Sequence, residues 1–459
     1  MAQERTIALD AMIASLLEEK KYNTLKDVFS TMAAADIAAL FEDLPESSLP
    51  LLFRLLPKEL AADTFVEMEP EQQELLITGF SDAELRDVVD ELYVDDAADI
   101  VEEMPANVVS RILQQADPEK RRMINEILHY PEDSAGSIMT TEYVSLLPQM
   151  TVEEAIRRIR RVGVDKETIN TCFVVDEKRK LLGTLTIRAL ILAEDGTQLE
   201  TLMTPNAVAV TTTEDQETVA GQLAKYDLTS IPVVDGEDRL VGIVTIDDAV
   251  DVLVEEATED IEKMAAITPS DRPYLKTSVW EVWKQRIPWL LLLMISATFT
   301  GMIITSFEDA LSKLVILTAY IPMLMDTGGN SGSQASVSII RSLSLGEVEL
   351  SDIFRVIWKE FRVSILCGLS LALVGFLKLL LLDGMLWTTE YNGVAVALVV
   401  SGTLLMTVIA AKLIGCTLPL LAKKIGLDPA VCASPFITTM VDALSLLIYF
   451  GVATAVLHI

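Results

Sequence analysis

Residues 287–306 read IPWLLLLMISATFTGMIITS, a run of 20 residues without a charged side chain. An α-helix rises about 1.5 Å per residue, so a run of this length can cross the roughly 30 Å hydrocarbon core of a bilayer. Further runs rich in apolar residues follow at 312–343, 363–382, 393–422 and 430–457. The sequence therefore predicts a C-terminal membrane domain, residues 287–459, with five transmembrane helices.

Lysine and arginine residues flank these predicted helices on one side of the membrane only. They occur before the first run, between the second and third, and between the fourth and fifth, whereas the loops SFEDALS (306–312) and DGMLWTTEYNG (383–393) contain none. Basic residues favour the cytoplasmic side, and the first residues, MAQERTIALDAM, lack the pattern of a signal sequence. We expect a multi-pass protein of a bacterial-type plasma (inner) membrane, with its N-terminus cytoplasmic and its C-terminus external.

Negative charge is concentrated in the part of the chain that precedes the membrane domain. The sequence has 68 acidic and 36 basic residues, of which residues 287–459 hold 11 and 9, so the first 286 residues hold 57 and 27. The negative electrostatic potential of such a region repels nucleic acid and attracts cations. Divalent cations and a lipid bilayer are therefore expected as partners, and nucleic acid is not.

Few residues are suited to catalysis or to soft metals. The four cysteines have no CxxC spacing, and the only two histidines are His129 and His458. This composition disfavours disulfides, zinc sites and histidine-based catalysis, and it leaves oxygen atoms as the main metal ligands. We therefore expect a protein that is not an enzyme.

The acidic part begins with a short helical repeat. In residues 1–130, apolar segments that end in proline, such as LFRLLP (52–57), FVEMEP (65–70) and VEEMP (101–105), recur about every 12 residues. A pair of helices then spans about 24 to 25 residues, which predicts a small solenoid in which each pair packs only on its neighbours.

A second repeat occupies residues 136–255. The segment CFVVDEKRKLLGTLTIRALI (172–191) matches a second segment, IPVVDGEDRLVGIVTIDDAV (231–250). Each copy predicts a strand, a tight turn, a strand and a helix. This pattern resembles a tandem pair of CBS domains, which are ligand-sensing α/β modules. A charged connector, residues 256–286, leads into the membrane. The predicted fold class is a multi-domain membrane protein with an α-helical solenoid N domain, tandem α/β CBS domains, a connecting helix and five transmembrane helices.

Two aspartates lie within the predicted membrane helices. At about 1.5 Å per residue, Asp326 lies roughly 21 Å and Asp442 roughly 18 Å from the starts of their runs. We therefore expect both carboxylates at similar depth on different helices. A carboxylate in this position normally marks an ion pathway or a pair, and a structural ion pair with Lys412 is the alternative.

Asp326 belongs to PMLMDTGGNSGSQ (322–334), which is rich in glycine and amide residues that form helix poorly. We expect a break in the second helix that turns carbonyl groups and the amides of Asn330 and Gln334 toward a cation path. Close packing against neighbouring helices through small residues is the other interpretation, and the two are compatible.

The same stretch carries a family resemblance. PMLMDTGGNSGSQASVSIIRSLSLGEV (322–348) and DPAVCASPFITTMVDALSLLIYF (428–450) resemble the MgtE family of magnesium channels, and the order of domains agrees over essentially the whole chain. The resemblance implies a homodimer with a pore on its two-fold axis, where Asp442 binds hydrated Mg²⁺ and Asp326 and Asn330 lie nearby. It also implies Mg²⁺ uptake across the plasma membrane.

The resemblance further implies a cytosolic magnesium sensor in the N and CBS domains. Carboxylates that repel one another at low Mg²⁺ would be bridged by the bound ion, and the connecting (plug) helix, 256–286, would then close the pore. The acidic positions that match are Asp95, Asp99, Asp215, Glu217, Asp227, Asp247, Asp251, Glu256, Glu259 and Asp260.

A nucleotide site is incomplete in this sequence. Some members of the family bind ATP in the CBS pair, with an aspartate after the turn of the first copy. Here that position is Ala189, which cannot hold a ribose, whereas the second copy keeps Thr245 and Asp248. ATP is therefore a candidate cofactor beside Mg²⁺, with Thr245 and Asp248 as its ligands.

Other functions fit the sequence less well. A membrane enzyme regulated by CBS domains would need a nucleophile and a base, and neither histidine lies near a polar motif. A CBS-regulated anion channel would not be expected to place two aspartates within the membrane. Among cation transporters, the sequence does not separate a channel from an ion-coupled carrier, or Mg²⁺ from Mn²⁺ and Co²⁺ as the ion carried.

Overall fold

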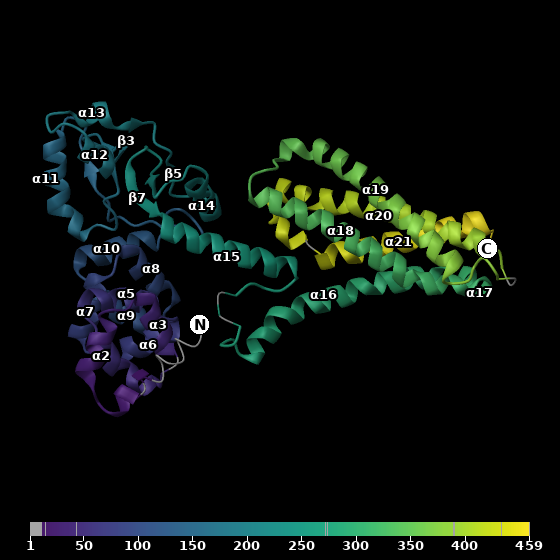
Figure 1. Ribbon diagram of the computed structural model, residues 1–459, viewed down its shortest axis with the longest axis horizontal. Helices are drawn as coiled ribbons and strands as arrows, with labels where there is room; N and C mark the ends of the chain where they lie inside the picture. The colour runs from purple at the N-terminus through teal and green to yellow at the C-terminus, as the bar shows by residue number, and fades with distance from the viewer. Residues whose placement is uncertain are drawn as a thin grey trace. The chain divides into compact units, whose positions relative to one another are not determined.

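The computed structural model describes residues 12–458 except 14, 43, 271, 273, 389, 390 and 433 (Figure 1). The chain divides after Leu253 into two compact units. The first unit holds the helical N domain and the α/β repeat, and the second holds the long apolar helices.

The N domain is a stack of short helices with a regular repeat. Helices α5, α7 and α9 begin at 58, 82 and 106, and α6, α8 and α10 begin at 70, 94 and 118, so equivalent helices start 24 residues apart (82 − 58, 106 − 82). The predicted solenoid is confirmed. Its elements are α2 (Tyr22–Phe29), α3 (Ala34–Glu42), η1 (Glu46–Ser48), α4 (Leu49–Phe53), α5 (Lys58–Val66), α6 (Pro70–Gly79), α7 (Asp82–Glu91), α8 (Val94–Glu103), α9 (Ala106–Gln115) and α10 (Pro118–Ile127).

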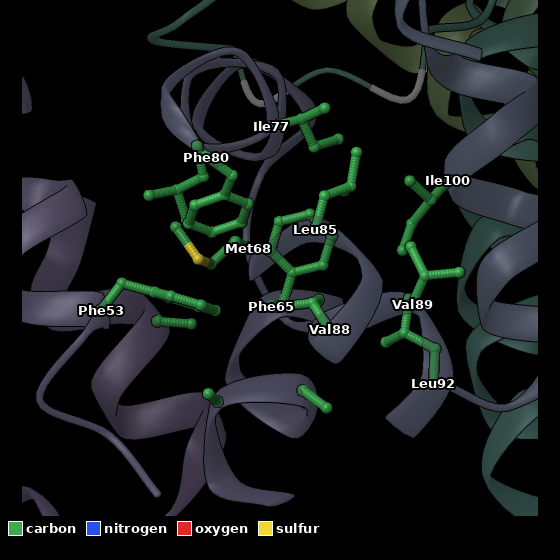
Figure 2. Packing of buried hydrophobic residues seen from close by; sticks show 14 of the residues in the cluster. Phe53, Phe65, Met68, Ile77, Phe80, Leu85, Val88, Val89, Leu92 and Ile100 are labelled. Carbon is green, nitrogen blue, oxygen red and sulfur yellow. The ribbon is translucent and has the colours of Figure 1, made fainter. Parts of the chain in front are cut away.

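Buried aromatic and aliphatic side chains join successive helix pairs of this domain. The ring of Phe53 lies 6.1 Å from that of Phe65 and 5.3 Å from that of Phe80, between ring centroids. Figure 2 shows these rings beside Met68 and Leu85 in the same cluster. Each helix pair therefore buries its apolar face against its neighbours, as expected of a solenoid.

The α/β repeat forms two small sheets, one for each copy. In each copy a short strand pairs in parallel with the first strand of an antiparallel hairpin. The first sheet has the order β1-β2-β3-β4 and the second β5-β6-β7. The strands are β1 (Ser145–Leu146), β2 (Thr171–Val175), β3 (Leu181–Thr186), β4 (Thr204–Pro205), β5 (Val210–Thr211), β6 (Ser230–Val234) and β7 (Leu240–Thr245).

Helices pack on these sheets and connect them to the second unit. Thr151 caps α11 by accepting from the Glu154 amide, and Asp215 caps α14 by accepting from the Thr218 amide. At Gly242 in β7 a Cβ would lie 2.8 Å from the carbonyl oxygen of Thr140, so only glycine permits this crossing. The helices are α11 (Val152–Val162), η2 (Gly163–Asp165), α12 (Ile187–Leu192), α13 (Leu199–Leu202), α14 (Gln216–Lys225) and α15 (Ile246–Met264).

The second unit is a bundle of long helices. Among the described residues, four helices are long and apolar enough to cross a membrane: α16, α19 with η4, α20, and α21 with η5. The fifth helix of the predicted bundle, α18, is less apolar and packs against α20 and α21 (Figure 1). The elements are α16 (Val279–Ser306), α17 (Glu308–Lys313), η3 (Val315–Tyr320), α18 (Ile321–Ser344), η4 (Leu350–Asp352), α19 (Ile353–Leu381), α20 (Gly393–Lys424), η5 (Pro429–Cys432) and α21 (Ser434–Leu457).

Candidate functional site

Helix α18 is continuous through the stretch in which a break was expected, so that prediction was wrong. Residues 321–344 form one α-helix, and Pro322 lies in its first turn, where proline is tolerated. The predicted second span was also too long at its start, because residues 308–313 form α17 and 315–320 form η3.

Close packing explains why glycines are found in a regular helix. A Cβ at Gly328 would lie 2.7 Å from Thr407 of α20, and one at Gly332 would lie 2.9 Å from Ile437 of α21. At Gly415 of α20 a Cβ would overlap the carbonyl oxygen of Gly332. The contact of three helices therefore outweighs the low helix propensity of glycine, which favours the packing interpretation.

The polar side chains of α18 lie on a different face from these glycines. Asp326 and Asn330 are exposed, and the Asn330 amide donates to the Asp326 carboxylate at 3.1 Å. Asp442 on α21 is half-buried, and its charge interacts with that of Asp326. Asp326 lies only five residues after the start of α18 (326 − 321), roughly 7.5 Å along the helix. The unbroken helix from residue 312 on which the expected depth of 21 Å rested is therefore not formed, and the charges of the two carboxylates interact.

Two lysines lie within the long helices. Lys378 reaches beyond the end of α19 and forms an ion pair with Asp383 at 2.9 Å. Lys412 on α20 is buried, with 5% of its surface exposed. No hydrogen bond or ion pair connects Lys412 to Asp326 or Asp442, so the structural ion pair considered from the sequence is not formed in the described chain.

A second group of carboxylates lies in the first unit, where α8 meets the CBS copies. Asp95 on α8 is 7% exposed, and its Oδ1 atom has no hydrogen-bond partner within the residues described. The charges of Asp96, Asp248 and Glu167 act on it. Asp99 follows one turn later on α8 and is exposed. This arrangement leaves negative charge concentrated where the N domain contacts the CBS copies.

These carboxylates ionise with difficulty. Burial, followed by the charges of Asp96 and Asp248, raises the pKa of Asp95 well above its usual range. Burial and the charge of Asp248 raise the pKa of Asp96 to about 6. Burial and the charges of Asp96 and Asp248 raise the pKa of Glu167 to about 8. In each case burial is the largest cause and the neighbouring carboxylates add to it, while Lys120 is a cation that acts on Asp96 and Glu142.

Sequence reasoning missed three members of this cluster. Asp96 belongs to the same acidic run as Asp95 and Asp99, so its neighbours were a usable signal. Glu142 accepts a hydrogen bond from the Val94 amide at 3.1 Å and thereby joins α8 to the first CBS copy. Glu142 and Glu167 lie outside the two matching repeat segments, and only the fold brings them to α8.

Three predicted metal ligands lie around α14 in the second CBS copy. Asp215 caps the start of α14. Glu217 lies in the first turn of the same helix and is half-buried. Asp227 follows the helix with a positive φ of 52°, and its side chain is exposed. Asp215 therefore already has a structural role as a helix cap.

Helix α15 carries the remaining predicted regulatory carboxylates, which are Asp247, Asp251, Glu256, Glu259 and Asp260. Those at its end have protein partners. The Lys263 ammonium lies 2.6 Å from Glu259, and the Ser344 hydroxyl donates to Asp260 at 3.0 Å. Burial raises the pKa of Asp260, which the Ser344 hydrogen bond partly offsets.

The residues proposed to hold a nucleotide, Thr245 and Asp248, lie next to the acidic cluster around Asp95. The buried Thr245 hydroxyl donates to the Asp248 carboxylate at the start of α15. In the first copy the equivalent turn is capped by Thr186, which accepts from the Ala189 amide. The second copy therefore has a hydroxyl and a carboxylate that could bind a ribose, and the first has only the hydroxyl.

The oxygen atoms available fit a hydrated divalent cation better than a tightly ligated one. Within the part of the chain that the structure describes, no three carboxylate, histidine or cysteine side chains converge to hold a metal together. Mg²⁺ usually keeps several waters and takes one or two carboxylates. The Oδ1 atom of Asp95 and the Oε2 atom of Glu167 are buried without a donor, so each could accept from the waters of such an ion.

Comparisons with known proteins cover nearly the whole chain. A family model described as divalent cation transporter matches residues 321–452, the MgtE intracellular N domain matches 12–133, and the CBS domain matches 135–196 and 199–255. The magnesium transporter MgtE of Thermus thermophilus is 38% identical over 455 residues, 98% of this chain and 99% of the relative. The Bacillus subtilis magnesium transporter MgtE is 33% identical, over 97% of each chain.

Two solved structures resemble the N-terminal half. One is the cytosolic domain of the Mg²⁺ channel MgtE in complex with ATP, with a TM-score of 0.51 and 39% identity, covering 53% of this chain and 99% of that chain. The other is the soluble part of a magnesium transporter, with a TM-score of 0.52 and 29% identity, covering 55% and 99%. Both support the N domain and CBS pair described above.

Proposed function

Because the chain belongs to the MgtE family of divalent cation transporters, we propose that it carries Mg²⁺ across the plasma membrane and closes when cytosolic Mg²⁺ binds its acidic domains. The observation that carries this proposal is the neighbouring pair of carboxylates, Asp326 and Asp442, on two helices of the membrane domain. Two negative charges at such a position favour a cation between or beside them.

In this proposal Asp442 binds the hydrated ion, and Asp326 with Asn330 completes the polar wall. A half-buried carboxylate can accept hydrogen bonds from the ion's waters without removing them, which suits Mg²⁺. Asp326 and Asn330 are exposed in a single protomer. A pore around them therefore needs a second wall, which supports a homodimer with the pore between the copies.

The pore assignment is tested by Mg²⁺ flux into liposomes that contain the purified full-length chain. Asp442→Ala is expected to abolish flux while the protein elutes normally from a size-exclusion column. Asp309→Asn, which neutralises an exposed carboxylate on α17, serves as the matched control and should keep wild-type flux. Retained flux in Asp442→Ala would remove Asp442 from the pathway.

Closure is proposed to begin at the acidic cluster of the first unit. Mg²⁺ bound near Asp95 would remove the repulsion among carboxylates on α8 and the CBS copies, and residues 256–286 would transmit the change to the pore. Moving a gate from 1:99 to 99:1 needs about 5.5 kcal/mol of differential binding. Several weak sites can supply this together, which fits a cluster that shares its ligands.

Limited proteolysis tests the sensor separately from transport. In the wild type, Mg²⁺ is expected to slow cleavage between the N domain and the CBS pair. The double variant Asp95→Asn with Glu167→Gln should need a higher Mg²⁺ concentration for the same protection, and Asp36→Asn on α3 is the exposed control. Unchanged protection in the double variant would show that these carboxylates do not sense Mg²⁺.

We also propose ATP as a ligand of the second CBS copy, with Thr245 and Asp248 at the ribose. The relative solved with ATP supports this, and Ala189 in the first copy limits it to one site for each protomer. The neighbouring carboxylates would repel the phosphates unless a cation accompanies them. Titration calorimetry with Mg²⁺ present should give binding that Thr245→Val weakens and Thr212→Val, a threonine in the loop after β5, leaves unchanged.

A further inference from the structure

The first turns of helix α19 extend beyond the part of the helix that can lie in hydrocarbon. The helix has 29 residues and is therefore roughly 43 Å long, whereas the hydrocarbon core of a bilayer is about 30 Å thick. Its longest stretch without a charged residue begins at Val363 and ends before Lys378. We therefore expect the residues before Val363 at the level of the lipid headgroups.

This end of α19 lies on the side of the membrane domain to which α15 is attached. The Ser344 hydroxyl, at the last residue of α18, donates to Asp260 of α15 at 3.0 Å. A short connection, residues 345–352, then leads to the start of α19. In the orientation expected from the sequence this is the cytosolic side, where anionic lipids give the leaflet a negative surface potential.

One face of the first turns of α19 packs against neighbouring helices. Helix α19 lies along α20 (Figure 1). Val356 is buried in a cluster with Cys416 and Leu420 of α20, and Ile357 packs against the same cluster. The charge of Glu360 acts on Cys416, so this carboxylate also lies on the side toward α20. The inward face therefore holds the apolar residues and one acid.

The opposite face carries three basic residues and a tryptophan. Residues three or four positions apart lie on one side of a helix, and this spacing joins four exposed residues, Arg355, Trp358, Lys359 and Arg362. Within the described part of the chain, only Arg355 of the three basic residues is in an ion pair, with Asp352 at 2.9 Å, and its side chain is still 88% exposed. This basic stripe therefore presents net positive charge to its surroundings.

Trp358 lies among these basic residues with its ring exposed. The guanidinium carbon of Arg362 is 5.9 Å from the centroid of the Trp358 ring, and the Phe361 ring stacks on the same ring with centroids 5.8 Å apart. Tryptophan is enriched where the membrane meets water, because its indole is apolar and has one N–H donor. Trp358 therefore supports the position of the basic stripe at the headgroup level.

Apolar residues continue the basic stripe toward the middle of the membrane. The next residues on this face, all exposed, are Leu366, Leu369, Leu373 and Leu377. Because side chains on a helix lean toward its N-terminus, Arg362 is directed away from these leucines and toward the headgroups. The face thus changes from cations to aliphatic side chains in the order in which a phospholipid changes from headgroup to acyl chains.

We propose that Arg355, Trp358, Lys359 and Arg362 bind the phosphate-bearing headgroup of an anionic phospholipid in the cytosolic leaflet. The basic side chains donate hydrogen bonds to the phosphate oxygens, Trp358 packs beside the glycerol, and the leucines contact the acyl chains. The acidic N and CBS domains would also be attracted to this charge, but the aliphatic continuation of the stripe favours a lipid. The inference requires that α19 spans the membrane and does not depend on which ion the chain carries.

The test measures lipid binding to the full-length chain, purified in detergent and depleted of lipid. Phosphatidylglycerol, which is anionic, and phosphatidylcholine, which is zwitterionic, are titrated separately, and native mass spectrometry counts the molecules bound. The wild type should bind phosphatidylglycerol more tightly. A basic residue near an anionic membrane surface strengthens binding about fivefold, so Lys359→Gln combined with Arg362→Gln should weaken phosphatidylglycerol binding about 25-fold and leave phosphatidylcholine binding within about twofold of wild type.

Two matched variants separate the basic stripe from net charge. Arg160→Gln combined with Arg161→Gln makes the same change of charge at exposed residues of α11 in the first unit, and should bind phosphatidylglycerol as the wild type does. Lys359→Arg keeps the charge and should also bind normally. If the double variant on α19 folds poorly, Lys359→Gln alone should still show a loss of about fivefold.

The melting temperature without added lipid distinguishes a lipid from a protein partner. The double variant on α19 should melt with the wild type in lipid-free detergent, and phosphatidylglycerol should raise the melting temperature of the wild type more. A lower melting temperature of the double variant without lipid would overturn the inference in favour of a contact within the protein. Wild-type phosphatidylglycerol affinity in that variant, equal losses in the α11 control, or displacement of the lipid by inorganic phosphate would also overturn it.

Discussion

Replacing Gly415 by alanine should disrupt the contact between α18 and α20. A Cβ at this position would overlap the carbonyl oxygen of Gly332 and lie 2.9 Å from its carbonyl carbon. Ordinary contacts begin near 3.4 Å, so the helices must separate by at least 0.5 Å (3.4 − 2.9). The obstacle is backbone in the middle of a helix, which cannot move aside as the end of a side chain can.

The size of the effect follows from comparison with Gly402 on the same helix. Nothing lies within 4 Å of a Cβ built at Gly402. Both substitutions gain up to about 1 kcal/mol in helix propensity, so their difference isolates the steric cost. Overpacking in a core typically costs about 1–3 kcal/mol. We therefore expect Gly415→Ala to be less stable than Gly402→Ala by that amount.

The assay is reversible unfolding of both variants in detergent, followed by loss of helix signal. Gly402→Ala should match or exceed the wild type in free energy of unfolding, and Gly415→Ala should fall below it. Separation of the helices would also shift Asp326 relative to Asp442, so Gly415→Ala should lower Mg²⁺ flux at equal protein amounts. Equal stability of the two variants would refute the close packing of Gly332 and Gly415.

Three further outcomes are expected. Because burial and nearby carboxylates raise the pKa of Asp96 to about 6 and of Glu167 to about 8, the stability that these two groups contribute without Mg²⁺ should be fullest below about pH 4 and be lost as pH rises through 8. Glu167→Gln should therefore flatten the upper part of the Mg²⁺-free proteolysis profile. Asp326→Asn removes one of two interacting charges and should reduce Mg²⁺ flux less than Asp442→Ala does. Lys412→Met removes a buried charge for which the described chain offers no ion pair, and should raise the free energy of unfolding by about 1–3 kcal/mol. A lower free energy of unfolding in this variant would show that Lys412 has a partner.

Features that depend on local pattern were predictable from the sequence. The 24-residue spacing of helix starts could be predicted from proline and apolar periodicity, because each helix pair packs mainly on its neighbours. The CBS hairpins were also predictable, since Gly183 and Gly242 lie at equivalent positions of the second hairpin strand in the two copies. The neighbouring carboxylates Asp326 and Asp442 could be expected because charges are rare in such helices.

Features that depend on contacts between distant residues were not predictable. Glycines in α18 have poor helix propensity, and only the partners on α20 and α21 show that they serve packing. Glu167 meets Asp96 because the N domain contacts the first CBS copy, and no spacing in the sequence encodes that contact. Lys263 follows Glu259 by four residues, which was a usable signal, but Asp428 is 165 positions away.

The two groups of carboxylates show how one kind of residue can have different surroundings in the same chain. At the end of α15, Glu259 and Asp428 share one lysine, which offsets part of their charge. On α8, Asp95 has an unpartnered buried oxygen, and the charges that act most strongly on it come from other carboxylates. A cation added from solution is expected to gain most where buried carboxylates act on one another. Sensitivity to Mg²⁺ is therefore expected where the fold brings buried acids from separate elements together, which an acidic run alone does not reveal.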